Sequence, residues 1–266
     1  MARKARRAQA TARETSGSPE PAAPMVPPTW VRARYHFHTF CYRDPRSAFS
    51  SALGLPVVSP TAVLLGIAST LFSIGENNEA LAFIWVADHC RVAVDPPDSA
   101  IFFRAFHQLR RYETAISKTK KKDFKPNPRI GFTQINQGTK EYALVDGTIT
   151  LFVGVPQVVV EATKLALRNR DHVGTHDSLC ALVGDVEECD EPSDVVYLPP
   201  ERWQSQPPQE PGVTILTLSR FSRPFEEPTV GSHWWMAGGD NTERVPYMIK
   251  GKFIGTTRGK IYRKHG

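Results

Sequence analysis

The chain has 266 residues and is 41% hydrophobic, so it can bury a substantial core as one large domain or two small ones. Its longest apolar run, Val57–Ile74, is interrupted by Ser, Thr, Pro and Gly and so does not form an unbroken membrane-spanning segment. The formal net charge is +6, and we expect a soluble protein with no membrane partner.

The first 28 residues are basic, then rich in Ser, Pro and Ala, and lack the apolar segment of a secretory signal. We expect them to form a disordered tail. A transit peptide is the alternative, but Glu14, Glu20 and the prolines oppose the amphipathic helix that such a peptide forms.

A strand is predicted over Trp30–Tyr42, because apolar and polar residues alternate there. One face carries Val31, Ala33, Tyr35, Phe37 and Thr39, and the other carries Arg32, Arg34, His36, His38 and Phe40. A sheet with an apolar back and a basic front is a common platform for RNA. We therefore predict that the two arginines and two histidines of the second face contact RNA. The alternative is that His36 and His38 are the general acid and base of a ribonuclease.

A buried helix is predicted next. Ser59 can cap its N-terminus, with Pro60 at the first helical position, where the missing N–H costs nothing. Apolar residues then recur at helical spacing as far as Gly75, which ends the helix. Because glycine in mid-helix costs about 1 kcal/mol relative to alanine, Gly66 predicts close packing on a strand. The apolar stretch Ala80–Val86 is either the end of a second helix or a buried strand.

The positive charge is concentrated between Arg104 and Arg129, where nine cationic and two acidic residues give +7 and leave about −1 for the rest of the chain. Each Lys or Arg on a phosphate releases a condensed counterion, so this excess favours nucleic acid. Interleaved aromatic residues favour single-stranded RNA, whose unstacked bases lie on the rings. The alternative is a solvated lysine run. The RNA-binding residues predicted here are Arg104, Arg110, Arg111, Tyr112, Lys118, Lys120, Lys121, Lys122, Phe124, Lys125, Arg129 and, beyond the stretch, Lys140.

Strands flank this stretch, at Arg91–Val94, Ala100–Phe106, Phe132–Ile135 and Ile149–Val153. Lys140–Val155 predicts a strand, an Asp-Gly turn and a second strand. Pro156–Arg170 predicts an amphipathic helix with Arg168 and Arg170 at the C-terminal end of its dipole, and a glycine turn and a strand follow over 173–188. This order matches the βαββαβ plan of ferredoxin-like and RRM-like domains, so we predict an α+β fold.

The four cysteines are too few and too scattered for a disulfide framework, which fits a reducing cytoplasm. His172, His176, Cys180 and Cys189 follow one another as H-x3-H-x3-C-x8-C, but zinc sites usually pair cysteines two to four residues apart. We expect a turn and a strand here, with no metal and no cofactor.

Composition divides the chain into a tail over 1–28, an RRM-like domain over 29–190 with a thumb at about 104–132, a Pro-rich linker over 191–212 and a β-rich C-terminal region over 213–266. The last region has cations among glycines, namely Lys250, Lys252, Arg258, Lys260, Arg263 and Lys264. This cluster is either a second RNA contact or a solvated β-hairpin, and its glycine spacing does not match a nucleotide-binding P-loop.

Five motifs in order resemble the CRISPR-associated protein Cas5 family, RAMP-type subunits of type I Cascade complexes that hold the 5′ handle of the CRISPR RNA. They are a first strand, a proline-led helix of small residues (Ser59–Phe72), a long basic β-hairpin thumb (about Arg104–Arg129), a strand similar to R/K-E-Y-L-x-D (Lys140–Asp146) and a turn similar to L-G-x-S-x-S/C-L (Val173–Leu179). The resemblance covers about residues 30–190.

The resemblance implies a thumb that wedges into the RNA handle, where phosphate contacts position the strand and base contacts specify it. It also implies as partners the CRISPR RNA, the Cascade backbone and large subunits, and target DNA near the protospacer-adjacent motif. Some family members cleave precursor RNA with Tyr, Lys and His side chains, and Tyr35, His36 and Lys118 are the candidates here.

The leading hypothesis is a non-catalytic RNA-binding subunit of an RNA-guided surveillance complex in antiviral defence. The alternative is a metal-independent endoribonuclease that processes precursor CRISPR RNA, with His36 or His38 as acid or base. A structural ribonucleoprotein subunit unrelated to CRISPR is a third hypothesis.

Overall fold

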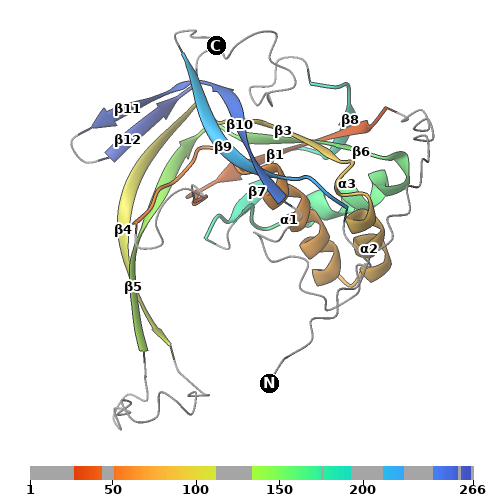
Figure 1. The fold of residues 1–266 in the computed structure, drawn as a ribbon, viewed down its shortest axis with the longest axis horizontal. Coiled ribbons are helices and arrows are strands. Elements are labelled where there is room, and N and C mark those ends of the chain that lie inside the picture. Colours follow the sequence, from red (N-terminus) through yellow and green to blue (C-terminus); the bar gives the residue numbers. More distant parts are fainter. Residues whose placement is uncertain are drawn as a thin grey trace, which may run out of the picture.

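The structure is a computed structural model. It describes residues 27–43, 51–111, 134–174, 177–192, 212–224, 242–256 and 259–264. These residues form two larger sheets, a two-stranded sheet and three α-helices, which confirms the predicted α+β class (Figure 1). Among them, no helix has the length and apolar character that crossing a membrane requires.

The first sheet is built around β1 (Thr29–Phe37). This strand pairs antiparallel with β6 (Ile149–Val155) on one side, and with β7 (Cys180–Leu182) and β8 (Glu187–Cys189) on the other. β3 (Arg91–Asp95) lies beyond β6 and pairs with it. Along the chain the order is strand, helices, strand, strand, helix, strand, and a hairpin is inserted between the second and third of these strands.

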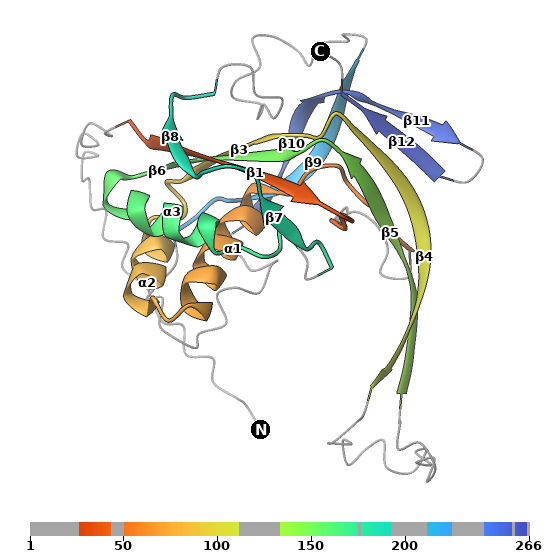
Figure 2. The ribbon, with the colours of Figure 1, turned by 180° about the vertical axis from the view of Figure 1, so that it is seen from behind.

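Helices cover one face of this sheet, as Figure 2 shows from behind. They are α1 (Pro60–Ser73), α2 (Asn77–Trp85), the short 3-10 helix η1 (Gln157–Val159) and α3 (Val160–Arg168). As predicted, proline stands at the start of α1 and the Ser59 hydroxyl accepts a hydrogen bond from a backbone N–H of the first turn.

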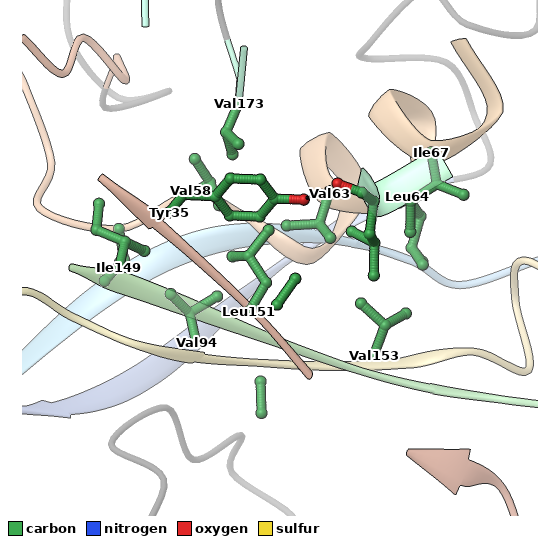
Figure 3. Packing of buried hydrophobic residues seen from close by; sticks show 14 of the residues in the cluster. Tyr35, Val58, Val63, Leu64, Ile67, Val94, Ile149, Leu151, Val153 and Val173 are labelled. Atoms are coloured by element: carbon green, nitrogen blue, oxygen red, sulfur yellow. Dashed lines mark hydrogen bonds between the residues drawn. The ribbon is translucent and has the colours of Figure 1, made fainter. Parts of the chain in front are cut away.

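The core lies between the helices and the apolar face of β1. Val31, Ala33, Tyr35 and Phe37 are all buried there, because alternate side chains of a strand share a face. Figure 3 shows the Tyr35 ring among aliphatic side chains of α1 and β6. Its hydroxyl donates to the Leu167 carbonyl of α3 at 2.6 Å. Burial raises the pKa of Tyr35, so the phenol stays protonated and the bond stays in place.

The second sheet has the order β11 (Lys252–Thr256), β12 (Gly259–Arg263), β4 (Ser99–Arg111), β5 (Gln134–Asp146) and β2 (Ser51–Ala52). β12 pairs antiparallel with β4, so the C-terminal strands extend a sheet that begins in the middle of the chain. The predicted hairpin near the C-terminus is therefore present, and it is paired with the body.

β9 (Val213–Phe221) and β10 (Thr242–Lys250) form the two-stranded sheet. Leu216 and Leu218 of β9 are buried in the same core cluster as the helices, and the hydroxyls of Thr61 and Ser219 lie 3.1 Å apart. The described part of the C-terminal region thus packs on α1 as well as on β4.

Several predicted elements differ in extent. β1 ends at Phe37, and Phe40, predicted on the basic face, is buried, packs against Phe37 and bridges Ala143 of β5. The ambiguous stretch Ala80–Val86 is helical. The strand predicted to end at Phe106 continues to Arg111 in β4. The strand predicted over Phe132–Ile135 and the first strand predicted within Lys140–Val155 form the single strand β5.

The prediction that Gly66 packs on a strand is wrong, because the group against it is the guanidinium of Arg170. Arg170 is buried and donates to the carbonyls of His172 (2.8 Å), Val63 (3.3 Å) and Ala62 (3.4 Å). A Cβ at position 66 would lie 1.8 Å from its Nη2 atom. Arg170 therefore does not serve the dipole of its own helix and instead binds the carbonyls of the first turn of α1.

We expect Gly66→Ala to lower the free energy of unfolding by about 2 kcal/mol, although alanine is the better helix former. The guanidinium is held by three hydrogen bonds and cannot move aside at low cost. Urea denaturation measures the effect, and in an Arg170→Leu background the same substitution should cost less. A stabilising effect of Gly66→Ala in the wild-type background would contradict this account.

Candidate nucleic-acid interface

β4 and β5 form a long antiparallel hairpin, the arm, with thirteen residue pairs from Ser99↔Asp146 to Arg111↔Gln134. β12 pairs with its near end, and β2 pairs with Thr139 and Lys140 of β5. Figures 1 and 2 show the arm curving away from the body. Because Arg111 pairs with Gln134, residues 112–133 are attached to its far end.

Most of the predicted basic cluster belongs to that far end. Outside the described residues lie Tyr112, Lys118, Lys120, Lys121, Lys122, Phe124, Lys125 and Arg129. For Arg110 and Arg111 the structure describes the backbone within β4. The sequence therefore shows that residues 112–133 are cationic, and the structure shows that they are connected to the far end of the arm.

A buried carboxylate lies at the base of the arm. Glu141 of β5 is 4% exposed, and its Oε2 accepts a hydrogen bond from the Gly54 N–H at 2.8 Å and lies 2.9 Å from Lys260 Nζ of β12. Arg104, its cross-strand partner on β4, has Nε 3.8 Å from Oε1. One carboxylate thus faces two cations, and Arg104 remains largely exposed.

Lys260 has further contacts that fix it in this position. Its ammonium donates to the Gly54 carbonyl at 2.8 Å and lies 4.7 Å from the Phe102 ring centroid and 5.1 Å from that of Phe253. The Gly54 carbonyl, the Glu141 carboxylate and two aromatic rings thus surround its ammonium group. Lys260 is thus a structural residue, and this part of the predicted C-terminal cluster is not a free RNA contact.

The other face of the arm is tied to the turn before β7. Lys140 Nζ lies 2.6 Å from Asp177 Oδ2, and the Tyr142 hydroxyl donates to the same oxygen at 3.3 Å. Burial, followed by the charge of Asp177, raises the pKa of Tyr142 to about 12, so the phenol remains a donor at neutral pH. The Ser178 hydroxyl donates to the Cys41 carbonyl and accepts from the Cys41 N–H, each at 2.9 Å.

The basic face of β1 points away from the helices. Arg32 forms an ion pair with Glu187 of β8, and the hydrogen bond between them lowers the pKa of Glu187 and raises that of Arg32. Arg34 is exposed and has no ion-pair partner among the described residues. The exposed rings of His36 and His38 lie edge to face, with centroids 5.6 Å apart.

The candidate trio for RNA cleavage is not brought together by the fold. Tyr35 faces α3 and is fully buried, whereas His36 lies on the opposite, open face of β1. Lys118 lies outside the described residues. Two neighbouring residues of one strand cannot act on the same phosphate when the sheet separates their side chains.

Three features of the site were missed at the level of sequence: the Glu141–Lys260 pair, the Asp177 anchor and Phe106. Phe106 is 67% exposed and lies on the same face of β4 as Arg104, so an aromatic ring and a cation occur there two residues apart. Alternation along the strand is the signal that would have found Phe106. The two ion pairs join residues far apart in the sequence, and no local pattern indicates them.

These features define an α+β protein with a projecting β-hairpin and cationic side chains on its arm and on its open sheet. No family model matches the chain. A curated relative, CRISPR-associated protein Cas5 from Archaeoglobus fulgidus, is 23% identical over 227 residues, which cover 84% of this chain and 93% of the relative. This similarity confirms the resemblance to the Cas5 family.

Two solved structures are also similar. One is a crystal structure of a CRISPR protein from Archaeoglobus fulgidus, with 14% identity and a TM-score of 0.36, covering 90% of this chain and 92% of that chain. The other is a chain of a CRISPR RNA-guided surveillance complex, with 12% identity and a TM-score of 0.36, covering 84% of this chain and 88% of that chain.

We expect Glu141→Gln to lower the free energy of unfolding by about 3 kcal/mol, because it leaves Lys260 without its carboxylate in a largely buried site. Urea denaturation measures the loss. Glu79→Gln, an exposed glutamate on α2, is the matched control and should change stability by less than about 0.5 kcal/mol. Equal effects of the two substitutions would mean that the buried pair does not hold the arm.

Proposed function

We propose that this chain is a Cas5-type subunit of a type I CRISPR surveillance complex in the cytoplasm and that it holds the 5′ handle of the CRISPR RNA. The observation that carries the proposal is the similarity to a Cas5 protein, which spans 84% of this chain and 93% of the relative. A match of that extent does not depend on one degenerate motif.

The fold supports the same function. In the first sheet, the strand order β7-β1-β6-β3 with helices on one face corresponds to a ferredoxin-like, RRM-like (RAMP-type) platform, whose open face is suited to RNA. Arg34, His36 and His38 lie on that open face. The arm acts as the thumb, and its two anchors, at Glu141 and Asp177, set its direction.

Charge supports RNA as the partner of the thumb. Residues 112–133 at its far end include six cationic and two acidic residues, a net charge of +4. Phosphate contacts from these cations would position the strand, and the ring of Phe106 beside Arg104 offers a surface for a base. The Cascade backbone subunit, the large subunit and target DNA near the protospacer-adjacent motif are the further partners in this proposal.

Neutralising Lys120, Lys121 and Lys122 together to Gln should weaken binding of repeat RNA and reduce the slope of log affinity against log salt by about 2, at roughly 0.7 per phosphate contact. Fluorescence anisotropy with labelled RNA over a salt series measures this slope. The control variant neutralises three exposed arginines away from the open face of the first sheet, Arg168 on α3, Arg223 after β9 and Arg244 on β10, and its slope should match wild type. An unchanged slope in the lysine variant would show that the run faces only solvent.

The rival function, a metal-independent endoribonuclease, rests on the exposed pair His36 and His38 beside Arg34. If the subunit only binds RNA, repeat RNA incubated with the protein in EDTA should remain intact, as gel electrophoresis would show. Cleavage that disappears in His36→Ala or His38→Ala would establish the rival function. His89→Ala, an exposed histidine in the turn after α2, serves as the control.

A further inference from the structure

A row of aliphatic side chains crosses one face of the second sheet. Leu144 of β5 is paired with Ile101 of β4, Ile101 with Ile261 of β12, and Ile261 with Ile254 of β11. Direct cross-strand partners point to the same face, so these four side chains form one continuous line. Leu144 and Ile101 are each 50% exposed and Ile254 is 38% exposed. The line is thus an apolar strip at the protein surface.

The strip ends at the edge strand of the sheet. β11 pairs with β12 on one side, and it is the last strand of this sheet in the described part of the chain. The outer edge of such a strand presents backbone N–H and C=O groups that can pair with an incoming strand. A strand added there would place a side chain directly beside Ile254 and so lengthen the aliphatic row.

The neighbouring row on the same face is cationic at this edge. Lys252 of β11 is paired with Arg263 of β12, both are exposed, and neither forms an ion pair with another described residue. Like charges directly opposite one another destabilise a sheet. Ser99 of β4 and Asp146 of β5 continue this row. Asp146 is the acidic residue of the row, but it lies two strands away from Arg263 and so does not neutralise the charge at the edge. A carboxylate on a strand beside Lys252 would relieve the repulsion.

We propose that β11 is a docking edge for an extended strand of a protein partner, which carries an acidic residue and an aliphatic residue two positions apart. The acidic residue would lie beside Lys252 and the aliphatic residue beside Ile254. RNA does not match this edge, because the β11 side chains on this face, Lys252, Ile254 and Thr256, include no aromatic ring on which a base can stack. The stacked rings of Phe103 and Tyr142 share the face but lie on β4 and β5. A second copy of β11, with the sequence KFIGT, does not supply the carboxylate.

The test uses the full chain and two fluorescein-labelled peptides, acetyl-TETVTVT-amide and the same peptide with Lys in place of Glu. We expect the acidic peptide to bind about tenfold more tightly than the basic one, by fluorescence anisotropy. Hydrogen exchange should slow in residues 252–256 when the acidic peptide is bound. In the double variant Lys252→Glu, Arg263→Glu, the basic peptide should bind more tightly than the acidic one. The substitution Ile254→Asp should weaken the binding of both peptides.

Equal affinity for the two peptides, or a preference that survives the charge reversal, would overturn the proposal. So would a dimer of the chain, seen in sedimentation, that Ile254→Asp dissociates, because a second copy would then occupy the edge. Repeat RNA is titrated against the same variants and should bind as tightly as to wild type. If the variant Lys252→Glu, Arg263→Glu loses affinity for RNA, the row of Lys252 and Arg263 belongs to an RNA surface and the docking proposal fails. The proposal that the protein binds RNA would still stand, so the two failures can be distinguished.

Discussion

The buried carboxylate of Glu141 determines where the arm leaves the body. A carboxylate at 4% exposure is costly unless cations and hydrogen-bond donors surround it, and here Lys260, Arg104 and the Gly54 N–H supply them. These partners come from β12, β4 and the segment after β2. The same charge therefore connects segments that span most of the sequence, and the C-terminal hairpin contributes to the position of the arm through β12.

On the opposite face of β5, the ion pair between Lys140 and Asp177 is a second, weaker anchor of the arm. The Lys140–Asp177 pair is about 40% exposed on each side, so its contribution is at most about 1 kcal/mol. The paired bonds between Ser178 and the backbone of Cys41 are buried and hold the same turn more firmly. The two anchors thus tie β5 to the rest of the protein through both of its faces.

Local patterns predicted the local structure well. Alternation identified the two faces of β1, the Ser-Pro pair located the start of α1, and the Asp-Gly turn between β5 and β6 has Gly147 at a φ of +84°. What failed depends on contacts distant in sequence. Gly66 is required by Arg170, Phe40 is drawn into the core by Phe37 and Ala143, and Lys260 belongs to Glu141. Of these partners, Arg170, Ala143 and Glu141 are too distant in sequence to leave a periodic signal.

The cations of the described residues differ in what surrounds them, and this difference underlies the two proposed kinds of partner. Arg32, Lys140 and Lys260 each form a close ion pair with a carboxylate, whereas Arg104 lies farther from Glu141, at 3.8 Å, and is largely exposed. Arg104 lies beside the exposed ring of Phe106, and a ring next to a cation suits a base next to its phosphate. Lys252 and Arg263 lie beside aliphatic side chains at a sheet edge, a combination that suits a polypeptide with alternating acidic and apolar residues. In the two proposals, RNA and a protein partner therefore use different parts of the second sheet.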